Sequence, residues 1–145
     1  MKTIRFLLAD DNRRVRQFLA YLLDGLEDIK VVGEAQDGYE AIAKTRSLLP
    51  DAVVMDISMP RMNGIEATQN IHFEFPDIRV IGLSISDDPE TTKEMLDAGA
   101  VTCFSKSLSW HSTISRIRQA LALNPSVPGT AISLKSAPSP VATTG

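Results

Sequence analysis

Five short runs of apolar residues recur along the chain, and a longer stretch of mixed character follows each of them. The runs are continuous and do not alternate with polar residues, which is typical of strands that other elements cover on both faces. Such strands are characteristic of parallel sheets. The runs span Ile4–Ala9, Val31–Gly33, Ala52–Met55, Val80–Leu83 and Val101–Phe104.

The first three intervening stretches have the spacing of helices with one face toward a core. After Asp11, apolar residues recur three and four positions apart. A weaker pattern ends at Pro50 and another at Pro76, because proline cannot continue a helix. The inward positions are expected to be Val15, Phe18, Leu19, Leu22, Leu23 and Leu26 in the first stretch, Ile42, Thr45 and Leu49 in the second, and Ala67, Ile71 and Phe75 in the third.

Capping residues mark the last two helices. Asp88 followed by Pro89 is typical of a helix start, because Asp caps free N–H groups and proline suits the first turn. This helix is expected to run to Ala98, with Gly99 as its C-terminal cap. Ser109 can cap a final helix. The inner face of that helix is expected to carry Ile114, Ile117 and Leu121.

Strand and helix patterns thus alternate five times over residues 1–123. Parallel strands need helical crossovers, so the alternation predicts one α/β domain with a parallel sheet. From Asn124 the chain is rich in proline, serine and threonine, and it has few large apolar residues. Residues 124–145 are therefore expected to form a flexible linker or disordered tail, with an extension packed on the domain as the alternative.

Composition narrows the class of protein. A chain of 145 residues with 43% hydrophobic content can build its own core. Its net charge of -3 gives no basic surface, so direct nucleic-acid binding is not expected. The apolar run near the N-terminus is too short for a signal peptide or a membrane span. The single cysteine, Cys103, allows no internal disulfide, and we expect a cytoplasmic protein without a membrane partner.

Polar side chains follow four of the five apolar runs. Asp10 and Asp11 follow the first run, Asp56 the third, Ser84 the fourth, and Lys106 comes after the fifth. Ligands of open parallel sheets bind beyond the carboxyl ends of the strands, so these residues are expected to converge there. Each alone has an ordinary interpretation, as a helix cap, a turn residue or a surface lysine. Their joint placement favours a functional site.

Three clustered carboxylates repel each other unless a cation joins them. Ligands that are all oxygen suit Mg²⁺, which binds one or two carboxylates, keeps several waters and contacts phosphate oxygens. A metal ion, a lysine and a hydroxyl together can stabilise a phosphoryl group in transfer. The residues alone therefore point to Mg²⁺-dependent phosphoryl chemistry.

This arrangement resembles the CheY-like receiver domain of two-component response regulators. The resemblance covers about residues 4–123 and implies a flavodoxin-like, doubly wound sheet of five parallel strands in the order 2-1-3-4-5, with five helices. The stretch from Leu83 to Asp88 is similar to the subfamily with a LuxR-type helix-turn-helix output domain. The motifs are Leu8-Ala9-Asp10-Asp11, Met55-Asp56 with Met59-Pro60-Arg61-Met62-Asn63-Gly64, Gly82-Leu83-Ser84 and Ser105-Lys106.

The resemblance implies a role for each site residue. Asp56 would be the phosphoacceptor for a sensor histidine kinase. The domain would assist its own phosphorylation and dephosphorylation and would not otherwise be an enzyme. Asp11, Asp56 and the backbone carbonyl of Ser58 would ligate Mg²⁺ or Mn²⁺, and Asp10 would hold metal-bound water. Ser84 and Lys106 would each contact a phosphoryl oxygen. A homodimer on phosphorylation and control of transcription are further implications.

Two positions depart from the family pattern. Cys103 stands where the family usually has Tyr or Phe, and Phe104 would point to the opposite side of a strand. A turning aromatic ring is therefore not the expected switch. Either the loop at residues 85–88 and the helix after it carry the signal, or the signal is weak. Ser107 follows the lysine where the family often has a cis-proline, and cis bonds before other residues are rare.

Three other functions compete with this interpretation. A haloacid-dehalogenase-like phosphatase needs a second Asp two residues after its nucleophile, where this chain has Ser58. A flavodoxin needs a Ser-, Thr- and Gly-rich phosphate loop after the first strand, where Asp10 and Asp11 would repel phosphate. The complete acidic, hydroxyl and lysine set argues against an interaction module that is never phosphorylated.

The predicted tail also bears on the output of the domain. About twenty residues cannot form a DNA-binding domain, so the chain is either a receiver cut from a larger transcription factor or a stand-alone receiver. The linker-like composition of residues 124–145 favours the first.

Overall fold

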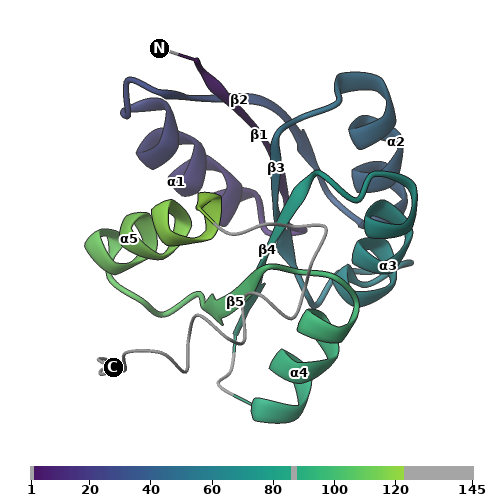
Figure 1. Cartoon of the computed structure of the whole chain (residues 1–145). Coiled ribbons are helices and arrows are strands. Elements are labelled where there is room, and N and C mark those ends of the chain that lie inside the picture. Colours follow the sequence, from purple (N-terminus) through teal and green to yellow (C-terminus); the bar gives the residue numbers. More distant parts are fainter. Residues whose placement is uncertain (1, 86–87, 123–145) are drawn as a thin grey trace.

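The computed structural model describes residues 2–85 and 88–122. Within them five strands and five helices alternate along the chain, as the apolar pattern predicts (Figure 1). The strands are β1 (Ile4–Ala9), β2 (Ile29–Ala35), β3 (Ala52–Asp56), β4 (Arg79–Ser84) and β5 (Thr102–Ser105). The helices are α1 (Arg13–Asp24), α2 (Gly38–Leu48), α3 (Gly64–Glu74), α4 (Pro89–Asp97) and α5 (Trp110–Leu121).

The strands form one parallel sheet in the order β2-β1-β3-β4-β5, which confirms the predicted fold. Helices α1 and α5 cover one face of the sheet, and α2, α3 and α4 cover the other (Figure 1). The chain places β2 on one side of β1 and then returns to place β3 on the other side. Strands β1 and β3 are therefore neighbours at the point where the direction of winding changes. Their carboxyl ends open the crevice in which ligands of such sheets bind.

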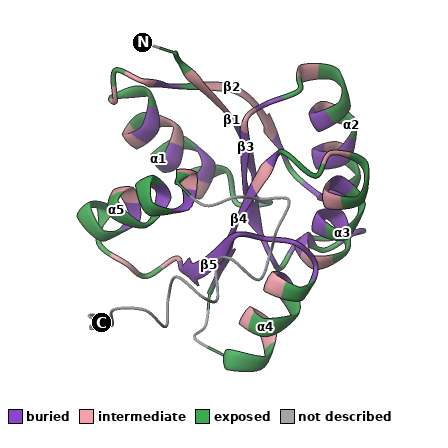
Figure 2. Ribbon diagram, viewed as in Figure 1, coloured by how far each residue is buried: buried purple, intermediate pink, exposed green. Residues whose placement is uncertain are grey.

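The core consists of two apolar layers, one on each face of the sheet (Figure 2). Side chains alternate along β1, so Leu7 and Ala9 enter one layer while Phe6 and Leu8 enter the other. Every residue of β3 is buried. Burial on both faces is the reason that the strands have continuous apolar runs.

Two residues expected on inner faces are exposed. Leu49, the C-cap of α2, is 56% exposed. The other is in α1. Phe18, expected on the inner face, is 51% exposed, whereas Arg16 is buried. Arg16 is buried because its guanidinium donates to the backbone oxygen of Asp10 at 2.6 Å and to Glu34 at 2.8 Å. A periodicity based on apolar residues alone cannot find such an arginine.

Helix ends follow the capping chemistry closely. Asp88 and Ser109 are the N-caps of α4 and α5, as predicted. The N-cap of α1 is Asn12, which leaves Asp10 and Asp11 outside the helix. Helix α4 ends at Asp97 with Ala98 as its cap, one residue earlier than expected. Gly99 follows with a φ of 122°, which favours glycine.

The edge strand β2 begins two residues before the predicted run and ends two residues after it. It includes Lys30 and Glu34, whose polarity hid the ends of the strand in the sequence. The predicted tail at 124–145 lies outside the described residues. In the part of the chain that the structure describes, no helix is both long and apolar enough to cross a membrane.

Candidate functional site

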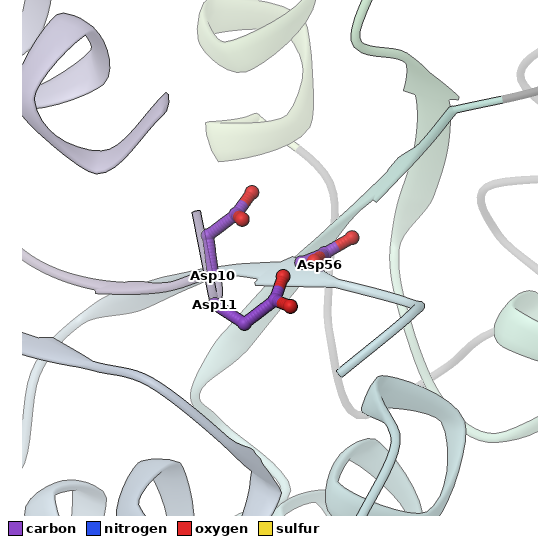
Figure 3. A group of neighbouring side chains, drawn as sticks. All are labelled: Asp10, Asp11 and Asp56. Carbon is purple, nitrogen blue, oxygen red and sulfur yellow. The ribbon is translucent and has the colours of Figure 1, made fainter. Parts of the chain in front are cut away.

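Three carboxylates meet at the carboxyl ends of β1 and β3 (Figure 3). Ala9 pairs with Met55 in the sheet, so Asp10 and Asp56, one residue further along, are neighbours. Oxygen atoms of Asp10, Asp11 and Asp56 all lie within 4.8 Å of one another. Asp10 and Asp56 are buried and Asp11 is exposed, so the cluster is open to solvent beside Asp11.

Lys106 provides the positive charge at this cluster. Its Nζ atom lies 2.8 Å from Asp10 Oδ2 and 3.1 Å from Asp56 Oδ1. Burial works against the charged ammonium, but its contacts with the two carboxylates outweigh burial and raise the pKa of Lys106. The backbone N–H of Lys106 donates to the backbone oxygen of Ser84 at 2.8 Å, which ties the lysine to the end of β4.

Asp56 carries a strongly disfavoured charge. Burial, followed by the negative charge of Asp10, raises its pKa from 3.8 to about 7, although Lys106 and the Ser58 N–H partly oppose the shift. Asp56 Oδ2 is buried and has no hydrogen-bond partner among the described residues. An unpaired carboxylate oxygen among three acidic side chains fits a hard cation that takes oxygen ligands.

Ser58 lies in the loop after Asp56, and Ser84 lies at the end of the neighbouring strand β4. Ser58 is exposed, and its backbone N–H donates to Asp56 Oδ1 at 3.3 Å. Ser84 is the buried last residue of β4, next to Leu83, which pairs with Asp56. The structure therefore brings all the predicted site residues to one edge of the sheet.

The two departures in β5 have clear consequences. Cys103 faces the core layer that contains Met95, whereas Phe104 faces the layer that contains Ile117. Phe104 thus lies on the opposite face, as predicted, and cannot take the place of an aromatic residue at 103. The bond before Ser107 is trans, like every other peptide bond in the described part of the chain.

Other polar contacts at this edge were not predicted from the sequence. Arg16 holds the backbone of Asp10, and Asn12 donates its N–H to Asp10 Oδ1 at 2.8 Å. Arg61, in the loop after Asp56, forms an ion pair with the buried Asp37 at the start of α2. Glu34 is 18 residues from Arg16 and Asp37 is 24 residues from Arg61, so no local pattern reveals these two ion pairs.

The fold and this arrangement of side chains agree with the family to which the chain belongs. The model of the response regulator receiver domain matches residues 6–118. The chain belongs to this family and is a receiver domain of two-component response regulators.

Relatives and solved structures also match response regulators. The chain is 34% identical over 115 residues to the response regulator GacA of Pseudomonas viridiflava, covering 79% of the chain and 54% of GacA. It is 38% identical over 117 residues to the transcriptional regulatory protein LiaR of Bacillus subtilis, covering 81% and 56%. The chain thus spans about half the length of these relatives.

Among solved structures, the response regulator domain of Thermotoga maritima CheB matches with a TM-score of 0.79 and 38% identity, over 86% of this chain and 100% of that one. A chain of the CheX–CheY–BeF3–Mg complex from Borrelia burgdorferi matches with a TM-score of 0.79 and 27% identity, over 84% and 92%.

Proposed function

We propose that Asp56 accepts a phosphoryl group from the phosphohistidine of a sensor histidine kinase. One observation carries this proposal: a buried carboxylate lies within a cluster of three, with the Lys106 ammonium 3.1 Å from one of its oxygens. An oxygen of Asp56 would form the new bond to phosphorus as the bond from phosphorus to the imidazole nitrogen breaks. The bonding pair would leave with the imidazole.

We propose Mg²⁺ or Mn²⁺ as the cofactor. Asp11, Asp56 and the backbone carbonyl of Ser58 would hold the ion, and Asp10 would hold a metal-bound water. The unpaired Asp56 Oδ2 supports this assignment. When bound, the ion neutralises charge on the phosphoryl oxygens.

Ser84 and Lys106 would stabilise the transferred group. The Lys106 ammonium, paired with Asp10 and Asp56, would exchange its contact with Asp56 for a phosphoryl oxygen. The Ser84 hydroxyl would donate to another phosphoryl oxygen. These residues assist a transfer that ends on the protein itself, so the domain would act as a phosphoacceptor and not as an enzyme that releases a product.

The proposed output is control of transcription through a DNA-binding domain outside this chain. This proposal is supported by a relative that is named a transcriptional regulatory protein and of which the chain covers 56%. The net charge of -3 supports a domain that does not itself bind nucleic acid. A cytoplasmic location and self-association on phosphorylation are parts of the same proposal.

The first test is incorporation of phosphate. After treatment with acetyl phosphate and Mg²⁺, intact mass should rise by one phosphoryl group in the wild type, and Asp56→Asn should show no such adduct. Asp97→Asn is the matched control, because Asp97 is an exposed carboxylate of a surface ion pair on α4. An undiminished adduct in Asp56→Asn would contradict the assignment.

The second test concerns the metal. Titration with Mg²⁺ should shift amide signals of residues near Asp10, Asp11 and Asp56, with affinity in the micromolar-to-millimolar range that suits few protein ligands and several waters. Asp11→Ala should abolish the shifts. An unchanged titration would mean that the ion binds elsewhere.

A further inference from the structure

The loop between β3 and α3, residues 57–63, carries Ser58 and is fixed at several points. At its ends, the Ile57 N–H donates to Leu83 at 3.0 Å, and the Gly64 N–H donates to Ile57 at 2.8 Å. Further along the loop, the buried Met62 accepts a hydrogen bond from the Gly38 N–H at 3.0 Å. The far part of the loop is therefore attached to the start of α2.

Arg61 makes the second attachment to α2, and its backbone is strained. Its φ of 66° lies in the left-handed region, which is unfavourable for a residue with a side chain. Its Nε donates to Asp37 Oδ2 at 3.0 Å, and its Nη2 contacts the same oxygen. Strained backbone persists where surrounding contacts enforce it, and this ion pair is such a contact.

The two carboxylate oxygens of Asp37 make two different contacts. Oδ1 caps α2 by accepting the Glu40 N–H at 2.8 Å, which leaves Oδ2 for Arg61. The Asp37 side chain is 3% exposed, whereas that of Arg61 is 68% exposed. The cap alone does not need the arginine, so the ion pair serves the loop, in addition to compensating a buried charge.

We propose that Arg61, through its ion pair with Asp37, positions the backbone carbonyl of Ser58 for the divalent cation and so sets the affinity of the site for the metal. This inference rests on the proposed function, in which that carbonyl is the third protein ligand. A backbone carbonyl cannot be re-aimed by a rotamer change. Its direction depends on the loop, and Arg61 is three residues further along.

The consequence should appear in metal affinity. A loop released from α2 must be ordered again when the ion binds, which weakens binding without removing a ligand. Arg61→Gly deletes the cation but readily adopts a positive φ, so the backbone path remains accessible. Mg²⁺ affinity, measured by amide shifts, should fall ~10-fold, as is typical when a residue that supports a metal ligand is lost.

Three further variants separate the loss of the Arg61 contact from a general loss of folding. Arg61→Lys keeps a cation but loses the forked guanidinium, so its affinity should lie between those of wild type and Arg61→Gly. Arg46→Ala removes an exposed ion pair between α2 and Glu74 of α3 without touching the loop, and it should bind Mg²⁺ as the wild type does. Asp37→Asn keeps a capping oxygen and should match Arg61→Gly, which provides a second measurement if Arg61→Gly folds poorly.

The rate of phosphorylation by acetyl phosphate distinguishes a weakened metal site from a general loss of folding. With limiting Mg²⁺, Arg61→Gly should react ~10-fold more slowly than wild type, and with saturating Mg²⁺ it should recover the wild-type rate. Wild-type affinity in both Arg61→Gly and Asp37→Asn, or a rate deficit that saturating Mg²⁺ does not repair, would overturn the inference. Failure of the wild type to bind Mg²⁺ near Asp11 would instead overturn the proposed function.

Discussion

Asp56 is a carboxylate in surroundings that disfavour its charge. Its pKa is raised from 3.8 to about 7 by burial and by Asp10, with Lys106 opposing the shift. A folded-state pKa above the unfolded value means that the native state binds more protons between these values. The stability contributed by protonated Asp56 is therefore present below about pH 4 and is lost as the pH rises through about 7.

This linkage predicts that Asp56→Asn stabilises the metal-free protein at pH 8. Asparagine removes the buried charge and keeps an acceptor for Lys106, so the free energy of unfolding should rise by about 1–3 kcal/mol. Urea unfolding in EDTA should show this gain at pH 8 and a smaller one at pH 5. Equal gains at both pH values would mean that the charge of Asp56 is not the cause.

Single residues could be predicted from the sequence where their position relative to a strand end determines their role. Asp10, Asp56 and Lys106 were recognisable because each follows an apolar run, and the ends of parallel strands meet. Arg16 and the pairing of Arg61 with Asp37 were not recognisable, because their partners come from other segments of the chain. Polar contacts between distant segments need the tertiary structure.

At the scale of elements, the start of α3 lies very close to the end of β3. A Cβ atom on Gly64 would lie 2.0 Å from the backbone oxygen of Asp56. Its φ is not in the left-handed region, so space alone requires glycine here. The "N-G" pair of the motif therefore combines a cap, Asn63, with a residue that lets the helix start against the site.

Gly64→Ala should lower the free energy of unfolding by about 1–3 kcal/mol or more, because the obstructing atom belongs to the backbone and cannot rotate away. It should also weaken Mg²⁺ binding, since the displaced residue is Asp56. Chemical unfolding and Mg²⁺ titration check the two effects. Gly25→Ala is the matched control: its nearest contacts would be at 3.4 Å, so it should cost little. A Gly64→Ala protein as stable as the control would refute the steric argument.

The side chains of strand β5 affect how a change at Asp56 can be transmitted to the surface. Cys103 pairs with Gly82 in the sheet and, with Ser84, lines a pocket of about 170 Å³ that also touches Thr92 of α4. A thiol is too small to change its contacts greatly when a phosphoryl group binds. Because a ligand shifts an equilibrium only through contacts that differ between the two states, β5 should contribute little.

In the wild type, we therefore expect beryllofluoride, a phosphoryl mimic, to change amide exchange in α4 more than in β5. Cys103→Tyr should add a change in β5, because a ring there can gain or lose contacts in the pocket. Cys103→Ala, which keeps a small side chain, should behave as the wild type. A wild type that already changes as strongly in β5 as in α4, with Cys103→Tyr adding nothing, would contradict this mechanism.

At the scale of the whole molecule, the fold was predictable because each pattern agreed with the others: apolar runs with parallel strands, caps with helix starts, and the family motif with the strand order. Which aromatic side chains are exposed on the helices was not predictable. The α1–α5 face exposes Phe18, Tyr21 and Trp110, although the sequence had assigned Phe18 to the core. Exposed aromatic side chains of this kind are frequent at protein interfaces.

This face is also connected to the site. A pocket of about 260 Å³ between α1 and α5 is lined by Phe18 and Leu108, and Lys106 and Asn12 form part of its wall. A change in the contacts of Lys106 on phosphorylation would therefore alter the wall of this pocket. The pocket gives a route from Lys106, which contacts the carboxylate cluster, to Phe18, one of the exposed aromatic residues of this face.

From this route we predict that phosphorylation promotes self-association through the α1–α5 face. Sedimentation well above micromolar concentration should show a larger mass with beryllofluoride and Mg²⁺ than without them. Tyr21→Arg should prevent the increase, because Tyr21 is 80% exposed and a charge there disfavours a buried interface while leaving the core intact. Phe73→Arg is the control, since Phe73 is 91% exposed but lies on α3, on the other face of the sheet. Identical masses in both states, or loss of association in Phe73→Arg but not in Tyr21→Arg, would show that this face is not the interface.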